Sequence, residues 1–372
     1  MLSQTSFFIK EEIHLSASQP RLLIFVGSYA EADDPGVYTY EMDSASGEIR
    51  LLDQATGMKN PTFLGVNAER CKVYAISETT EGGERIGEII AFDLDSAGKL
   101  RELNRELTIR PSSSHIQLDR SGRFAVVSGY HGGNVGLVEL RADGAVGKLV
   151  DERQHEGQGA DPVRQDRPHP HSVAFSPDNR YALVADLGLD RIVVYSFESE
   201  TGRLVYQSEA STPPGAGPRH LAFHPNGQWL YSINEVNSSL SLFSYVEATG
   251  ELVLQDTVST LPLDYAGENT TAEVAISTDG RYLYGSNRGH DSLVQFAIDS
   301  ESGRLTLVEH VSSQGGHPRH FALTPDGLHL IAANRDDNLL AVFAVAPDSG
   351  RLTFTGRTVT VSKPVCIKPV WF

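Results

Sequence analysis

Residues 176–184 read SPDNRYALV, a short turn sequence followed directly by aromatic and aliphatic residues. Asp and Asn favour tight turns, and apolar segments on both sides of such a turn are typical of a β-hairpin. Related stretches recur along the chain, and these are NAERCKVYA (67–75), DRSGRFAVV (119–127), HPNGQWLYS (224–232), STDGRYLYG (277–285) and TPDGLHLIA (324–332). The sequence therefore predicts the same hairpin six times.

The spacing of these hairpins indicates one repeated unit. The residues six positions before each turn, together with the start of the C-terminal segment PVCIKPVWF, are Pro61, Ser113, Pro170, Pro218, Thr271, Pro318 and Pro364. The intervals between them are 52, 57, 48, 53, 47 and 46 residues. A second series of turns, such as DSAGKL (95–100) and ESETGRL (198–204), repeats with the same period. Two hairpins per unit of roughly 50 residues predict four strands, as in a β-propeller blade.

We therefore expect an all-β fold, a seven-bladed β-propeller with four antiparallel strands per blade, over residues 21–372. The last unit has room for only its first strand, whereas the N-terminal region supplies the segments LLIFVGSY, GVYTYEM and IRLLDQA. A composite blade built from both ends would close the ring and leave no exposed sheet edge. Residues 1–20 lack the pattern of a signal peptide, and we expect them to form a poorly ordered leader.

The composition argues against several kinds of partner. The chain has 372 residues, with 31 Lys and Arg against 48 Asp and Glu, and a formal net charge of −17. Without a basic excess, we expect no binding to nucleic acid or to an anionic membrane. No apolar run reaches the ~18 residues needed to cross a bilayer, and the two cysteines lie outside any CxxC motif. These features predict a cytoplasmic protein without a disulfide framework.

Polar residues gather at one end of the predicted inner strands. The first strand of a blade lines the central channel and the second returns antiparallel to it, so the start of one and the end of the other share a rim. The polar residues at these positions are His115, His171, Arg219, His220, Asn234, Glu235, Glu273, Asn287, Arg288, Arg319 and His320. Polar groups that converge in a concave pocket indicate a binding or catalytic site. The long loop 151–170 enters at the same rim and is expected to form one wall.

Several segments around this rim resemble a known family. The stretches RPHPHSVAFSPDNRY (167–181), GPRHLAFHPNGQWLYSINEV (217–236), DGRYLYGSNRGHD (279–291) and PRHFALTPDG (318–327) look like the lactonase-type seven-bladed β-propellers, and the likeness covers nearly everything from residue 22 onward. The resemblance implies an enzyme whose catalytic residues are His171, Arg219, Glu235 and Arg288. The other rim residues, which are His115, His220, Glu273, Arg319, His320, Asn234 and Asn287, would bind the substrate.

The resemblance also implies a reaction. The family contains bacterial 6-phosphogluconolactonases of the pentose phosphate pathway, so the expected activity is hydrolysis of a sugar-acid lactone, with 6-phosphoglucono-δ-lactone as the first choice of substrate. It also contains fungal carboxy-muconate lactonizing enzymes, or muconate cyclases, and the sequence barely separates the two activities. In either case the partner would be a small anionic lactone or sugar phosphate.

The chemistry of the side chains suggests a role for each catalytic residue. Glu235 or His171 would be the base that activates water, and Arg219 would stabilise the oxyanion of the tetrahedral intermediate. Arg288 and Arg319 would hold the phosphate or carboxylate of the substrate. The chain has no G-x-S-x-G motif, so we expect no acyl-enzyme.

A metal site and an interaction scaffold are the alternatives. His169 and His171 alternate along a strand, as two zinc ligands could, but no further residue with ligand spacing accompanies them. We therefore expect a metal-independent enzyme without a cofactor. A non-catalytic propeller that binds other proteins is the second alternative. The WD dipeptides of many such propellers are absent, and the polar rim is small and central.

Overall fold

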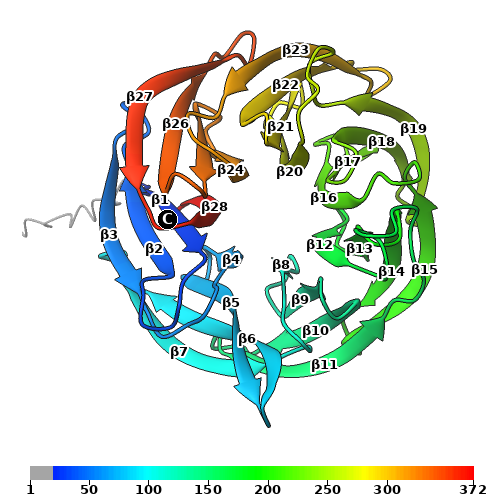
Figure 1. Ribbon diagram of the computed structural model, residues 1–372. Coiled ribbons are helices and arrows are strands. Elements are labelled where there is room, and N and C mark those ends of the chain that lie inside the picture. Colours follow the sequence, from blue (N-terminus) through cyan, green and yellow to red (C-terminus); the bar gives the residue numbers. More distant parts are fainter. Residues whose placement is uncertain (1–19) are drawn as a thin grey trace, which may run out of the picture.

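The computed structural model describes residues 20–372, which form seven four-stranded antiparallel sheets arranged as a ring (Figure 1). This confirms the predicted seven-bladed β-propeller. No helix occurs in the described range, so none there is long and apolar enough to cross a membrane. The expected leader lies outside the described residues, apart from Pro20.

Six blades are built from consecutive strands, each starting with the strand that lines the channel. The first contains β4 (Leu64–Asn67), β5 (Lys72–Glu81), β6 (Glu84–Leu94) and β7 (Leu100–Leu107). The second contains β8 (His115–Leu118), β9 (Phe124–Gly129), β10 (Asn134–Leu140) and β11 (Val146–Gln154). The third contains β12 (Pro170–Phe175), β13 (Tyr181–Asp186), β14 (Arg191–Glu198) and β15 (Arg203–Ser211).

The next three blades follow the same order. The fourth contains β16 (Pro218–Phe223), β17 (Trp229–Asn234), β18 (Ser239–Val246) and β19 (Glu251–Ser259). The fifth contains β20 (Thr270–Ile276), β21 (Tyr282–Arg288), β22 (Ser292–Ile298) and β23 (Leu305–Ser312). The sixth contains β24 (Pro318–Leu323), β25 (His329–Asn334), β26 (Leu339–Val345) and β27 (Leu352–Thr360).

The seventh blade joins the two ends of the chain, as predicted. It contains β28 (Pro364–Trp371), β1 (Leu22–Ser28), β2 (Val37–Met42) and β3 (Ile49–Ala55), in that order across the sheet. The antiparallel pairing of β1 with β28 runs from Leu22 opposite Trp371 to Ser28 opposite Pro364. The last strand therefore supplies the channel lining of a blade that the N-terminal strands complete.

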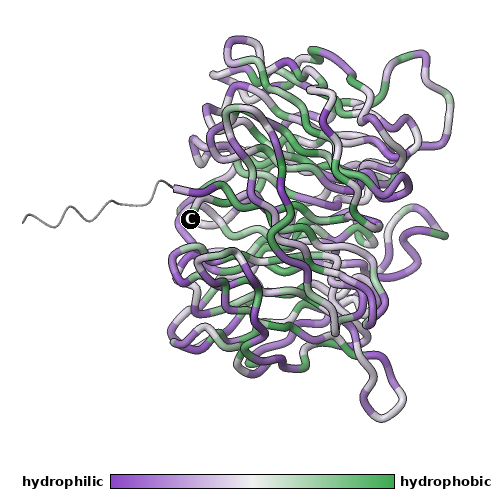
Figure 2. The backbone as a smooth tube through the Cα atoms, turned by 90° about the vertical axis from the view of Figure 1, so that its left-hand side faces the viewer, coloured by the Kyte–Doolittle hydropathy of each residue, from purple (hydrophilic) through white to green (hydrophobic). Residues whose placement is uncertain are grey.

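Apolar residues fill the space between neighbouring blades, while polar turns lie on both faces of the ring (Figure 2). A tyrosine on the second strand of three blades ties each to the next blade, because its ring is fully buried and its hydroxyl donates to a turn carbonyl there. Tyr74 donates to Gly144, Tyr231 to Gly303 and Tyr284 to Gly350, at 2.9, 2.6 and 2.6 Å. The outer strand of a blade, such as β15, is largely exposed.

Three inner strands begin with the same irregularity. In β12 the pairing with β13 passes from Pro170 to Ser172, in β16 it passes from Pro218 to His220, and in β24 from Pro318 to His320. The skipped residues are His171, Arg219 and Arg319. A β-bulge of this kind leaves one residue out of the ladder and turns its side chain away from the ordinary alternation. The fold thus presents these three side chains at the rim of the channel.

Candidate active site

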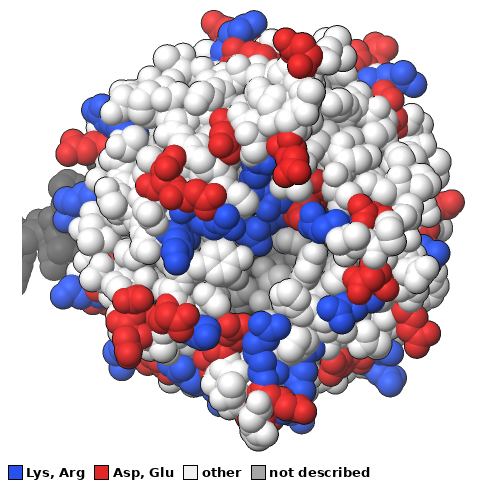
Figure 3. Space-filling view, viewed as in Figure 1, with Lys and Arg blue, Asp and Glu red and all other residues white. Residues whose placement is uncertain are grey.

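A cavity of about 310 Å³ opens at the centre of one face of the ring. Figure 3 shows the hollow on this face and the Lys and Arg side chains that gather beside it. Residues from several blades line the cavity, among them Phe63, Tyr130, His171, Arg219, Glu235 and Arg319. Five of the predicted rim residues thus line the pocket, namely His171, Arg219, His220, Glu235 and Arg319, whereas Arg288 is not part of the lining.

The carboxylate of Glu235, directly after β17, is surrounded by guanidinium groups. Its Oε2 lies 2.7 Å from Arg288 Nη2 and 3.1 Å from Arg219 Nε, and its Oε1 accepts a hydrogen bond from Arg164 Nη2. Arg319 contributes a fourth positive charge that acts on the same carboxylate. We call Glu235 and these four arginines the guanidinium cluster.

The electrostatics of this cluster are dominated by burial and by the arginines. Burial alone would raise the pKa of Glu235, but the charges of Arg288, Arg219, Arg319 and Arg164 together hold it well below its usual range. Burial and the neighbouring Arg319 and Arg288 lower the pKa of Arg219 to about 9. At neutral pH the cluster therefore holds one carboxylate anion and four guanidinium cations.

Part of the donor capacity of the cluster is unused. Arg219 Nη1 donates to the carbonyl of Ala272 at 2.6 Å, whereas its buried Nε has no hydrogen-bond partner within residues 20–372, although it lies 3.1 Å from Glu235 Oε2. The guanidinium of Arg319 forms no ion pair with any described residue and stands 5.8 Å from the ring centre of Tyr29. Such donors suit an anionic ligand, because a guanidinium offers planar, paired N–H groups to carboxylate or phosphate oxygens.

His171 lies beside the cluster and is a neutral imidazole at neutral pH. Burial and the charges of Arg219, Arg319 and Arg288 lower its pKa well below the usual value. Within the described chain its buried Nδ1 has no hydrogen-bond partner. Its ring meets Tyr130 edge-on, with the ring centres 5.6 Å apart. A neutral, unpaired imidazole on a cavity wall can accept a proton from water.

Deeper in the channel lies a second polar group, which we call the imidazole cluster: Phe63, His115, His220, Glu273 and His320. The ring of Phe63 is 4.1 Å from that of His115, 5.8 Å from that of His220 and 5.6 Å from that of His320. Glu273 Oε2 lies 2.9 Å from His220 Nδ1 and 3.0 Å from His320 Nε2. Of these five side chains, Phe63 and His220 reach the cavity.

The histidines of this cluster are held neutral. Burial, more than any neighbouring charge, lowers the pKa of His115 and His220 well below the usual value and lowers that of His320 to about 3. The backbone N–H of Ile367 donates to His320 Nδ1, so the proton of that ring is on Nε2 and points at Glu273. The expected substrate-binding residues His115, Glu273 and His320 thus lie beneath the pocket and contact one another or Phe63.

Asn234 and Asn287 do not reach the pocket, which corrects their expected role in substrate binding. Both are fully buried inside their blades. The amide of Asn234 donates to Ser239 and Ser241, both at 2.9 Å. The amide of Asn287 donates to the carbonyl of Thr260 and accepts from the Thr260 hydroxyl. Buried amides need such partners, and these two stabilise the ends of β17 and β21.

Arg164 is the member of the guanidinium cluster that the sequence did not identify. It lies in the loop between β11 and β12, which was expected only to form a wall. The signal was the 57-residue interval, the longest of the six, but length alone does not tell which of the two arginines in the loop, Arg164 or Arg167, faces Glu235. No group of three or more His, Cys, Asp or Glu residues in the described part of the chain could hold a metal ion.

Comparison with known proteins shows which family this chain resembles. Residues 23–369 match the family model described as Lactonase, 7-bladed beta-propeller. The chain is 33% identical over 345 residues to the 6-phosphogluconolactonase of Bacillus subtilis, a match that covers 92% of this chain and 97% of that protein. It is 31% identical over 307 residues to the 6-phosphogluconolactonase of Formosa agariphila, covering 81% and 86%.

Among solved structures, the fold is similar to the periplasmic gluconolactonase of Pseudomonas aeruginosa. The TM-score is 0.87 and the sequence identity 31%, with 94% of this chain and 99% of that chain covered. The likeness therefore extends over the whole ring, including the blades that carry the guanidinium cluster.

Proposed function

The chain belongs to the lactonase family of seven-bladed β-propellers and is a lactonase, and on that premise we propose that it hydrolyses 6-phosphoglucono-δ-lactone to 6-phosphogluconate. The observation that carries this choice of substrate is the charge of the guanidinium cluster. One carboxylate faces four guanidinium groups in a chain whose net charge is −17. Such a local excess of positive charge suits a substrate that carries a phosphate.

In the proposed reaction, His171 accepts a proton from a water molecule while the oxygen of that water attacks the lactone carbonyl carbon. The negative charge then develops on the carbonyl oxygen, to which the guanidinium of Arg219 can donate a hydrogen bond because Arg219 lines the cavity. When the intermediate collapses, the bond from the carbonyl carbon to the ring oxygen breaks. The imidazolium returns its proton to that oxygen, which becomes the hydroxyl of the open acid.

The low pKa of His171 fits this role once an anion is bound. Burial and the surrounding arginines lower it, and a phosphate placed among these arginines would offset part of their charge. The pKa of His171 then rises toward the range in which it can take up a proton. A δ-lactone is a reactive ester, so a weak base is enough.

We assign Glu235 the role of holding the arginines in place. Its carboxylate contacts three guanidinium groups and its pKa lies well below the usual range. A carboxylate stabilised in this way is a poor proton acceptor. It fixes Arg219 in the cavity wall, where that side chain can meet the substrate, and it also holds the buried Arg288.

The test is a substrate panel on the purified protein: 6-phosphoglucono-δ-lactone, glucono-δ-lactone and carboxy-cis,cis-muconate, each with and without EDTA. We expect the highest kcat/KM for the phosphorylated lactone and no effect of EDTA. Preference for the unphosphorylated lactone would overturn the substrate assignment, and turnover of the muconate alone would make the protein a cyclase. A loss with EDTA that zinc restores would overturn metal independence.

A further inference from the structure

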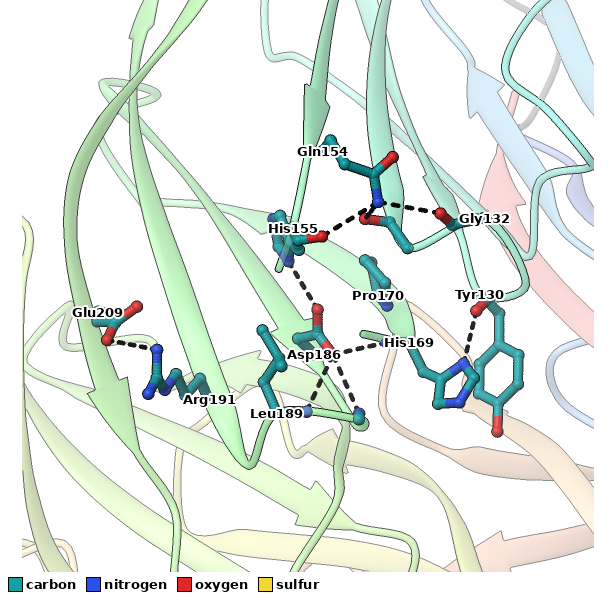
Figure 4. Close-up of polar contacts among 12 residues, drawn as sticks. Tyr130, Gly132, Gln154, His155, His169, Pro170, Asp186, Leu189, Arg191 and Glu209 are labelled. Atoms are coloured by element: carbon teal, nitrogen blue, oxygen red, sulfur yellow. Dashed lines mark hydrogen bonds and ion pairs between the residues drawn. The ribbon is translucent and has the colours of Figure 1, made fainter. Parts of the chain in front are cut away.

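The loop between β11 and β12 is held at both ends by one buried carboxylate (Figure 4). Asp186, at the end of β13, contacts His155 Nδ1 through Oδ2 at 2.6 Å and accepts the backbone N–H of His169 through Oδ1 at 2.8 Å. The other ring nitrogen of His155 is 2.8 Å from the hydroxyl of Tyr195. A loop whose two ends share one carboxylate has a fixed entry and exit.

The middle of the loop is fixed as well. The amide of Gln165, which is fully buried, donates to the carbonyl of Leu187 at 2.8 Å and to Asp190 Oδ1 at 2.6 Å. Asp161 Oδ1 accepts the backbone N–H of Arg164 at 2.9 Å. The backbone of Arg164 is therefore held next to a buried anchor, and only its side chain retains freedom.

That side chain differs from the other partners of Glu235 in its exposure. Arg164 is 35% exposed, whereas Arg219 and Arg288 are 3% and 5% exposed. Arg219 and Arg288 also donate to backbone carbonyls, of Ala272 and Thr271. If Arg164 moved away, Glu235 would keep two buried cationic partners, so its charge would still be balanced.

From this geometry we propose that Arg164 is a specificity-determining ligand: it exchanges Glu235 for the negatively charged group of the substrate that lies away from the reacting carbonyl. The inference deepens the proposed function and rests on it. The loop supplies a partly exposed guanidinium that contacts Glu235, a residue of the pocket lining. A phosphate monoester bound there would provide more oxygens than the single carboxylate oxygen that Arg164 contacts now.

The experiment compares Arg164→Ala with Arg167→Ala on 6-phosphoglucono-δ-lactone and on glucono-δ-lactone. Arg167 is a matched control because it lies in the same loop, is 59% exposed and approaches only Asp166, at 4.0 Å. We expect Arg164→Ala to lower kcat/KM on the phosphorylated lactone by ~10–100-fold, the scale of a charge-assisted hydrogen bond, and to change that on the neutral lactone far less. Arg167→Ala should stay within about twofold on both.

Equal losses on the two lactones would overturn the inference, because they would show that Arg164 only holds Glu235. Unchanged kinetics would overturn it too. Calorimetric titration with 6-phosphogluconate gives a readout that needs no turnover, and there the affinity of Arg164→Ala should fall while that of Arg167→Ala does not. If the wild-type protein opens neither lactone, the proposed function fails, and the titration alone still decides whether Arg164 binds the phosphorylated anion.

Discussion

The channel contains two polar clusters, each built around one glutamate. The glutamate of one cluster has cationic partners, whereas the glutamate of the other has neutral partners. Around Glu235 the partners are guanidinium groups that remain charged. Around Glu273 they are His220 and His320, both held neutral. In β16 and β24 the two kinds of residue are sequence neighbours, since Arg219 precedes His220 and Arg319 precedes His320. One step along an inner strand therefore separates a layer of charged arginines from a layer of neutral histidines.

From this difference we infer that the guanidinium cluster binds the substrate and that the imidazole cluster supports it structurally. The guanidinium cluster has donors without a hydrogen-bond partner among the described residues and more positive than negative charge, which suits an anionic ligand. In the imidazole cluster Glu273 accepts the N–H groups of His220 and His320. Phe63 packs against the three imidazole rings of the cluster. The two imidazole N–H groups and the Glu273 carboxylate satisfy one another and stabilise a single arrangement, although His220 Nε2 has no hydrogen-bond partner among the described residues. The imidazole cluster, or lower layer, therefore supports the guanidinium cluster structurally.

The largest expected effect is a loss of unfolding free energy in mild acid, caused by the histidines of the imidazole cluster. The unfolded chain binds protons at its histidines below pH ~6.5, whereas the folded pKa of His115, His220 and His320 is far lower. Their contribution is thus fully present above pH ~6.5 and is lost as the pH falls from there toward the folded pKa values. At pH 5 the three histidines should together remove about 6 kcal/mol of unfolding free energy. Chemical denaturation between pH 8 and pH 5 measures this loss together with that of His171 and His317, whose pKa values are also lowered by burial, so histidine variants are needed to isolate the share of the imidazole cluster.

The variant His115→Gln gives the control, because it removes one of the three titrating groups and should reduce the acid loss by about 2 kcal/mol. Glu235 should not contribute in this window, since its pKa is lowered and its stabilisation disappears only below the unfolded value near 4.5. A stability that is constant from pH 8 to pH 5 would show that the imidazole cluster accepts protons while folded.

Removing the negative charge from the guanidinium cluster should have the next largest effect. Glu235→Gln keeps the shape but leaves Arg219 and Arg288 as buried cations without a counter-charge. Breaking a buried ion pair on one side typically costs about 3–5 kcal/mol. We therefore expect a loss of that size in unfolding free energy, measured at pH 7, together with weak activity. Full stability would mean that water or another carboxylate compensates the arginines.

The proposed base gives the third prediction. His171→Gln keeps a side chain of similar size and leaves the arginines untouched, so KM should change little. Turnover should fall by ~10²-fold, about 2.7 kcal/mol, at the low end for the loss of a general base because the lactone is reactive. Measuring kcat and KM at pH 7 tests this. A variant with nearly full kcat would return the role of base to Glu235.

The sequence predicted the parts of this molecule that depend on repetition. Turn residues and their period predicted the seven blades, and the polar residues next to Pro170, Pro218 and Pro318 predicted which strands line the pocket. The β-bulges that turn His171, Arg219 and Arg319 into it were not anticipated, although the same proline precedes each.

Other features depend on tertiary contacts that no local pattern reveals. Asn234 and Asn287 occupy rim positions in the sequence, yet Asn234 bonds within its own blade and Asn287 bonds Thr260, directly after the last strand of the preceding blade. The place of Arg164 depends on how Asp186, Gln165 and Asp190 fold a long loop, and those contacts span up to 31 residues. The pKa of His171 likewise depends on arginines from several blades.

The smallest effect is expected for Glu273→Gln, the counterpart of Glu235→Gln in the lower layer. The amide oxygen of Gln can accept the same two N–H groups, from His220 and His320, that the carboxylate oxygen accepts now. Because these donors are neutral imidazoles, no buried cation is left without a partner. The two bonds lose only their charge assistance, and removal of a buried charge offsets part of that loss, so unfolding free energy should fall by at most about 2 kcal/mol.

Denaturation of both glutamine variants at pH 7 makes the comparison. Turnover of the lactone by Glu273→Gln should stay close to that of the wild type, since Glu273 lies beneath the cavity. If Glu273→Gln is destabilised as much as Glu235→Gln, at least one imidazole of the lower layer is protonated, and the contrast between the two layers is wrong. If instead its KM rises while its stability is unchanged, Glu273 contacts the substrate, as the sequence first suggested.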